Sequence, residues 1–147
     1  MRAIVQRVRE AQVSVDGTVI GRIDCGLLIF IAIHRDDSQR EAQRLRDKIL
    51  RLRIFSDPDG KMNLDVLQIR GSLLIVSQFT LYGETSRGNR PSYSEAAPPE
   101  KARDLYELFV RFCRDECSNV QTGQFQAHMQ VQLVNDGPVT LLCQAES

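Results

Sequence analysis

Two apolar runs limit the folds open to this chain more than any other feature. One is GLLIFIAI at residues 26–33, and the other is in GSLLIVSQFTLY at residues 71–82. An apolar run of this length without polar alternation is typical of a strand buried on both faces. A sheet built around two such strands needs cover on each side, and the rest of the chain must supply it.

The flanking segments predict the elements that provide this cover. Asp16-Gly17 is a strong two-residue hairpin signal. Asp36, Asp37 and Ser38 are candidate helix caps, and Pro98-Pro99 is a typical helix start. In chain order we expect a strand at 2–8, a hairpin at 11–23, strands at 26–33 and 71–82 with a helix at 39–53 between them, a helix from Pro99 to about residue 116, and strands at 125–134 and 138–144. This order predicts an α+β fold, with a curved, mostly antiparallel sheet and two helices packed outside it.

Length and charge narrow the class of protein. The chain has 147 residues, which predicts one domain over 1–147. Its 19 basic and 19 acidic residues balance, and this argues against a protein that coats nucleic acid with its whole surface. The 39–53 segment is nevertheless rich in cations, and it is either a solvated helix face or a local basic patch. These cations are Arg40, Arg44, Arg46, Lys48, Arg51 and Arg53.

The same composition predicts a cytoplasmic protein. The chain has no run of about 18 apolar residues, and MRAIVQRVRE lacks the apolar core of a signal peptide. Reduced thiols are then expected at its four cysteines, which are Cys25, Cys113, Cys117 and Cys143. Cys113 and Cys117 are spaced to share a metal ion, but two ligands do not make a zinc site. We therefore expect buried thiols, with no metal and no cofactor.

The usual catalytic motifs are missing from the sequence. It contains no G-x-S-x-G elbow, no phosphate-binding P-loop and no G-x-G-x-x-G. His34 and His128 are each either a catalytic base or an ordinary strand-end histidine.

Ser77–Thr80, the SQFT segment, is the polar stretch that stands out. It follows the core residues LLIVS, and sites are commonly built where a strand leaves the core. Thr80 has no adjacent base to make it a nucleophile. Backbone N–H groups of the segment are instead candidates to stabilise an oxyanion, or its hydroxyls simply satisfy neighbouring backbone groups.

A second unusual feature is Gly137-Pro138, which lies between two strand-like segments in MQVQLVNDGPVTLLCQ. Proline cannot donate a ladder hydrogen bond and glycine weakens a strand. Asn135-Asp136 already offers turn chemistry, so a hairpin tip does not require Pro138. The long polar loop GETSRGNRPSYSEAAPPE, with Arg87 and Arg90, is also of a length that is usually functional or mobile.

A resemblance to a known family is carried by four stretches: the opening MRAIVQRV, RIFSDPDGKMN, SQFTLYG in mid-chain and NDGPVT near the end. The chain resembles the D-aminoacyl-tRNA deacylase family over essentially its whole length. The resemblance implies hydrolysis of the ester between a D-amino acid and the 3′ end of tRNA. It also implies a cytoplasmic homodimer with a compact β-barrel-like core and an active site at the subunit interface. The partners are then aminoacyl-tRNA and a second copy of the chain.

The resemblance also assigns residues. Ser77, Gln78, Phe79 and Thr80 would line the pocket around the terminal adenosine and the ester, with catalytic N–H groups at Phe79 and Thr80. Gly137 and Pro138 would form a Gly-cisPro motif inserted from the other subunit, which rejects L-amino acids, and Arg7 would brace it. The ribose 2′-hydroxyl would assist catalysis, and glycyl-tRNA would be cleaved as well.

Two other functions stay open at this point. A non-catalytic dimeric RNA-binding module would need stacking aromatics and a basic stripe, whereas aromatics are 6% of residues and charge is balanced. A thiol or metal hydrolase is the enzymatic alternative.

Overall fold

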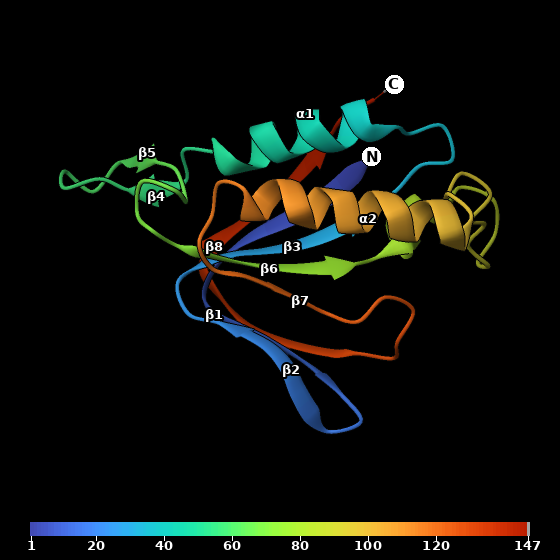
Figure 1. The fold of residues 1–147 in the computed structure, drawn as a ribbon, viewed down its shortest axis with the longest axis horizontal. Helices are drawn as coiled ribbons and strands as arrows, with labels where there is room; N and C mark the ends of the chain where they lie inside the picture. Colours follow the sequence, from blue (N-terminus) through green and yellow to red (C-terminus); the bar gives the residue numbers. More distant parts are fainter. Residues whose placement is uncertain (147) are drawn as a thin grey trace.

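A computed structural model describes residues 1–146, and it contains one main sheet with two helices on one side (Figure 1). Strands run in the order β2-β1-β3-β6-β7, and β8 pairs with β1 along nearly its whole length, from Arg2 to Ser14, on the edge opposite β2 and β3. β1 is antiparallel to β2, β3 and β8, while β3 and β6, and β6 and β7, are parallel. The strands are β1 (Arg2–Val15), β2 (Thr18–Ile23), β3 (Gly26–Ala32), β6 (Ser72–Ser77), β7 (Val120–Thr122) and β8 (Gln130–Gln144). The α+β fold with a curved, mostly antiparallel, barrel-like core is confirmed.

The two helices are α1 (Gln39–Leu50) and α2 (Pro99–Arg114), which lie side by side over the sheet (Figure 1). Ser38 caps α1 in a reciprocal capping box with Glu41, which satisfies free N–H groups of the first turn. α1 ends earlier than the 39–53 segment predicted, because Ile54 and Phe55 turn into the core. Phe55 opens a separate small hairpin of β4 (Phe55–Ser56) and β5 (Met62–Leu64).

The apolar runs are buried on both faces because the sheet separates two clusters. Leu27, Ile29 and Ile75 belong to the cluster that also holds buried residues of the helices. Leu28 and Leu74 belong to a second cluster inside the curled half of the sheet. Figure 1 shows how this half forms: β1 and β8 bend midway, and β2 lies along the bent part. The prediction of strands covered on each face is therefore confirmed for β3 and β6.

Several elements differ from the prediction. The predicted strand at 2–8 and the first arm of the hairpin predicted at 11–23 form one continuous strand, β1. The 71–82 segment is a strand only to Ser77, after which Phe79–Tyr82 forms the 3₁₀ helix η1. β7 is three residues long and was not predicted. The two C-terminal strands are a single strand, β8, which continues through Gly137-Pro138.

A bulge lets β8 pass the Gly-Pro. Gln6 pairs with Thr140 and Val8 with Asn135, so residues 136–139 of β8 lie opposite Arg7 alone. Side chains replace the missing ladder bonds: Arg7 Nε donates to the Asp136 carbonyl at 2.8 Å, and the Val139 N–H donates to Asn135 Oδ1 at 2.8 Å. The proline is tolerated because the bulged residues make no ladder hydrogen bond, so no N–H is needed at this position.

Gly26 of β3 lies close to the backbone of Ser72 in β6, and this contact gives a stability prediction. A Cβ at Gly26 would lie 1.9 Å from the Ser72 carbonyl oxygen, which is backbone and does not rotate away. We expect Gly26→Ala to lower the free energy of unfolding by about 3 kcal/mol, measured by urea denaturation. Cys25→Ala, at the exposed neighbour, should change it by less than about 0.5 kcal/mol. Equal stability of the two variants would contradict the close approach.

Candidate active site

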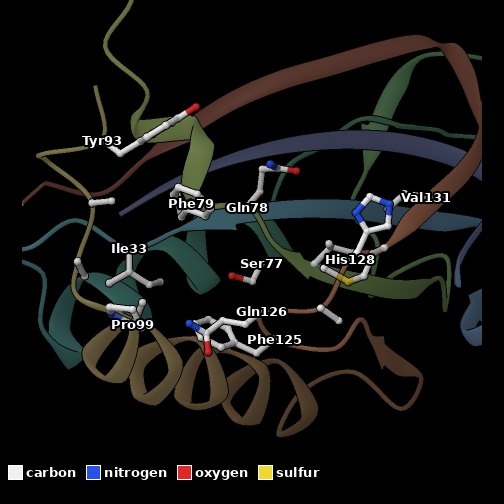
Figure 2. Close-up of a pocket in the computed structure, with 17 residues that line it drawn as sticks. Ile33, Ser77, Gln78, Phe79, Tyr93, Pro99, Phe125, Gln126, His128 and Val131 are labelled. Carbon is white, nitrogen blue, oxygen red and sulfur yellow. The ribbon is translucent and has the colours of Figure 1, made fainter. Parts of the chain in front are cut away.

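The main concavity is a cavity of about 690 Å³ between the sheet and the start of α2. Figure 2 shows Gln78 and Phe79 on one side of it, Phe125 and Gln126 on the opposite side along α2, and Ser77 between them. Its walls come from the end of β6, from η1, from the loop before α2 and from the segment between β7 and β8. A mostly apolar cavity with a few convergent polar groups is the usual form of a ligand site.

The SQFT segment forms one wall because the sheet ends there. The Gln78 N–H still donates to the Ile31 carbonyl at 2.8 Å, which continues the β3–β6 ladder by one residue. The chain then turns into η1, which leaves Phe79 55% exposed and in edge contact with Tyr93 at 5.1 Å. Ser77, Gln78 and Phe79 line the cavity. Thr80, which was expected in the same lining, is exposed and not among the residues that line the cavity; its hydroxyl accepts a hydrogen bond from the Gln78 amide.

Two backbone donors in this wall are free. Within residues 1–146, the N–H groups of Phe79 and Thr80 have no hydrogen-bond acceptor, as expected at the start of a helical turn without a side-chain cap. They sit where the strand meets the cavity. Such unpaired, fixed N–H groups are suited to stabilise negative charge on an oxygen.

The Gly137-Pro138 segment lies elsewhere on the chain. The segment lies opposite Arg7 of β1, and Arg7 pairs with Leu27 of β3, whereas Ser77 of β6 pairs with Ile31 of β3. The two motifs are therefore separated by four residues along β3 and by three strand-to-strand spacings, from β8 to β1, β3 and β6. At about 3.3 Å per residue and 4.8 Å per strand, the separation is on the order of 20 Å. One copy of the chain therefore does not bring these two motifs into one pocket.

Gly137 occupies a position that suits only glycine. Its φ is +134°, a region that residues with a Cβ rarely adopt. A Cβ there would lie 2.8 Å from Arg7 Nη2. The Gly137-Pro138 peptide bond is cis, and both residues are exposed. Arg7 fixes the segment, since it bonds to the Asp136 carbonyl and also to the Ile54 carbonyl.

The two histidines differ in surroundings. His34 Nδ1 accepts from the Asp36 N–H at 3.1 Å, and Nε2 bonds to Glu95 at 2.9 Å. This bond to His34 lowers the pKa of Glu95. His34 thus ties the loop before α2 to the sheet. His128 is exposed and lines the cavity.

Cys113 and Cys117 are both buried in the core near the end of α2. Burial raises the pKa of Cys113 to about 12, which disfavours the thiolate that a metal or a reactive thiol requires. In the described part of the chain, no group of three or more His, Cys, Asp or Glu is placed to hold a metal ion.

Four of the six cations of the 39–53 segment, Arg44, Lys48, Arg51 and Arg53, line one shallow surface groove together with Asp47 and Leu52. Arg46 is held by Asp47 and Glu116 and lies over the Phe112 ring. Arg53 is bonded to Asn63. Arg40, Arg44 and Lys48 on α1, Arg51 at its C-terminal cap, and Arg87 and Arg90 in the loop before α2 are exposed.

Sequence reasoning missed part of the cavity. Tyr93, Phe125, Gln126 and Met129 all line it. Tyr93 lies in the long polar loop, whereas Phe125, Gln126 and Met129 fall in the strand predicted at 125–134, which in the structure begins only at Gln130. The irregular segment before Gln130 that reaches the cavity was therefore not predicted. No helix among residues 1–146 is long and apolar enough to cross a bilayer.

Comparison with known proteins decides the family. A model of the family described as D-Tyr-tRNA(Tyr) deacylase matches residues 4–144. The chain belongs to this family. The D-aminoacyl-tRNA deacylase of Thermosipho africanus is 56% identical over 142 residues, which cover 97% of this chain and 95% of that protein. The D-aminoacyl-tRNA deacylase of Escherichia coli O81 is 54% identical over 144 residues, with 98% and 99% covered. The resemblance inferred from the motifs is confirmed.

Solved structures share the fold of this deacylase family member. The c-Myc DNA Unwinding Element Binding Protein superposes with a TM-score of 0.95 at 37% identity, over 100% of both chains. A probable eukaryotic D-amino acid tRNA deacylase superposes with a TM-score of 0.84 at 18% identity, over 98% of each chain. The second match concerns the fold alone.

Proposed function

We propose that this protein hydrolyses the ester bond of D-aminoacyl-tRNA in the cytoplasm and releases free D-amino acid and tRNA. The observation that carries the proposal is the SQFT segment at the cavity wall, with two unpaired N–H groups, in a chain of the deacylase family. Relatives more than half identical bear the name of this activity.

The active form is a homodimer in which each cavity receives the Gly137-Pro138 segment of the other copy. The separation of about 20 Å within one chain and the exposure of both motifs support this arrangement. An isolated copy would then lack half of its site.

Selection between D- and L-amino acids follows when backbone groups of the protein contact the substituents of the substrate's α-carbon. The enzyme accepts many side chains, so the side chain itself carries no usable signal. Carbonyl groups of Gly137 and Pro138 accept from the substrate's α-ammonium, and the missing Cβ at Gly137 allows a close approach. With ammonium and ester both held, an L side chain would collide with backbone, whereas a D side chain would point away.

Catalysis needs no protein nucleophile. Water attacks the ester carbonyl, the N–H groups of Phe79 and Thr80 stabilise the oxyanion, and the C–O bond to the ribose breaks with a proton delivered to the 3′-oxygen. The vicinal 2′-hydroxyl of the RNA positions the water or carries its proton. The protein supplies orientation, which fits a wall of backbone donors without a paired base.

The direct test measures release of labelled amino acid from matched tRNAs. We expect D-aminoacyl-tRNA to be cleaved at least about 100-fold faster than its L counterpart. Glycyl-tRNA should be cleaved too, because glycine has only hydrogen where an L side chain would collide. Equal rates on D and L esters would refute the proposal, and survival of glycyl-tRNA would refute the steric form of selection.

Thr80→Ala tests the absence of a nucleophile. Its hydroxyl bonds to Gln78, so we expect kcat/KM within about tenfold of wild type, whereas deleting a nucleophile costs a factor on the order of 10⁴ or more. A D-aminoacyl-tRNA that ends in 2′-deoxyadenosine should be cleaved poorly by both proteins. A collapse of activity in Thr80→Ala, with normal cleavage of the deoxy substrate, would assign the chemistry to Thr80 instead.

The alternative of a non-catalytic nucleic-acid-binding module has one point in its favour: the solved structure at 37% identity is named as a DNA unwinding element binding protein. Charge does not favour it, since basic and acidic residues number 19 each. The assay above separates the two, because a binding module would retain tRNA on a filter without releasing amino acid.

A further inference from the structure

Gln126 is in an unusual backbone conformation at the edge of the cavity. Its φ is +63°, in the left-handed region that glycine adopts freely and other residues adopt at a cost in free energy. The residue is exposed and lines the cavity. A non-glycine residue held in this region beside a binding site indicates that its side chain has a role there.

Arg103 of α2 fixes the orientation of the Gln126 amide. Arg103 Nη2 lies 3.2 Å from Gln126 Oε1. A guanidinium has only donors, so the Gln126 atom that faces it is the carbonyl oxygen. The Nε2 amide group, with its two donors, is left for another partner, and Figure 2 shows the side chain lying along the α2 wall toward Pro99.

The side chain of Arg103 packs against residues of the α2 wall. Its guanidinium lies over the Phe125 ring at 5.2 Å, and Phe125 also packs against Tyr106. The ion pairs found within residues 1–146 do not include Arg103, although Asp104 and Glu107 are on the same helix. Its charge is therefore not neutralised by any carboxylate of residues 1–146.

Gln126 lines the cavity and Arg103 lies next to it, so the pair offers N–H donors and one positive charge beside the cavity. Their natural ligand is an anion with several oxygen acceptors. The deeper wall is apolar, with Ile33 and Ala102 buried, and suits a base. The exposed mouth suits the sugar-phosphate backbone.

We propose that Gln126 and Arg103 bind the 5′-phosphate of the terminal nucleotide of the RNA, across the cavity from η1. This rests on the proposed function, since the aminoacyl ester is then placed at Ser77–Thr80 and the nucleotide spans to the α2 wall. The pair fixes the distance between the ester and the phosphate. It thereby orients the 3′ end of the substrate before hydrolysis.

The test compares non-hydrolysable D-aminoacyl-adenosine amides with and without a 5′-phosphate methyl ester. For the wild-type protein the phosphate should strengthen binding by about tenfold, as expected for charge-assisted hydrogen bonds. Gln126→Gly and Arg103→Ala should each lose most of this gain while binding the phosphate-free compound as wild type does. Equal weakening on both compounds would mean that the pair contacts the nucleoside, and no weakening would mean that it contacts neither; each outcome overturns the proposal.

Two further readouts separate binding from a structural role. Gln126→Gly removes the left-handed cost, so its Tm should not fall, yet its KM for D-aminoacyl-tRNA should rise about tenfold. Arg70→Gly is the matched control, because Arg70 also has a positive φ but lies in a turn away from the cavity.

Arg103→Ala should reduce the slope of log kcat/KM against log salt by about 0.7, the value for one phosphate contact on a single strand, and Arg103→Lys should restore that slope. Arg111→Ala, further along α2 and exposed, should leave the slope unchanged.

Failure of this inference is distinct from failure of the proposed function. If wild-type protein cleaves D-aminoacyl-tRNA and the phosphate has no effect on binding of the amides, the phosphate site is wrong and the deacylase stands. If wild-type protein cleaves no aminoacyl ester but binds the phosphorylated amide more tightly in a manner that depends on Gln126, the site stands and the hydrolase does not.

Discussion

Gly137→Ala is expected to lower kcat/KM for D-aminoacyl-tRNA by at least about 100-fold, because displacements near 1 Å at a positioning group have effects of that size. The added methyl would lie 2.8 Å from Arg7 Nη2 and 2.9 Å from Val139 Cγ2. Arg7 is held by two backbone carbonyls and does not simply move aside. The φ of +134° adds a backbone cost for any residue with a Cβ. The segment must therefore shift, and with it the carbonyls proposed to hold the α-ammonium.

Gly60→Ala is the matched control for this prediction. Gly60 also has a positive φ, +78°, but a Cβ there would meet nothing within 4 Å. Its substitution should cost roughly 1 kcal/mol of stability and leave the deacylase rate unchanged. Full activity of a folded Gly137→Ala protein would show that the segment does not contact the substrate. A loss of activity in both variants would point to general destabilisation instead.

Local patterns predicted those elements whose signals are local. The Asp16-Gly17 tip, the Ser38 cap and the Pro99 helix start are found as expected. β8 was divided in two because Gly-Pro reads as a break, whereas bonds from Arg7 and Asn135 carry the strand past it. Arg7 is 129 residues from Asp136, so no local pattern contains that bond.

The site divides in the same way. Ser77, Gln78 and Phe79 could be placed at the cavity because a strand that leaves the core is visible in the sequence. Tyr93 and Gln126 reach it through irregular segments, and tertiary packing alone brings them together. The left-handed φ of Gln126 is also invisible in sequence, since glutamine is not a residue that favours it.

The other large effect concerns stability, at a buried ion pair behind η1. The amine of Met1 lies 2.7 Å from Asp37 Oδ1 and 2.8 Å from the Ala145 carbonyl, and the side chains of Met1 and Asp37 are 0% and 2% exposed. Asp37 Oδ2 also accepts from the His34 N–H at 2.7 Å. The carboxylate thus joins the N-terminus to the segment that follows β3, and the Met1 amine links both to the C-terminal segment.

Asp37→Asn should lower the free energy of unfolding by about 3–5 kcal/mol, the usual cost of leaving one member of a buried pair without its counter-charge. The asparagine would in addition direct an NH₂ group at one of two donors, either the Met1 amine or the His34 N–H. Asp36→Asn is the control: that carboxylate is 66% exposed, and its loss should cost less than about 0.5 kcal/mol. Urea denaturation measures both variants, and a loss under about 1 kcal/mol in Asp37→Asn would contradict a structural ion pair.

Because Arg2 follows Met1 and donates to the Leu81 carbonyl at 2.9 Å while covering the Tyr82 ring, release of the N-terminus also frees η1. The deacylase rate of Asp37→Asn, measured where the variant is still folded, should therefore fall more than that of Gly26→Ala, whose strain lies at the far end of β6.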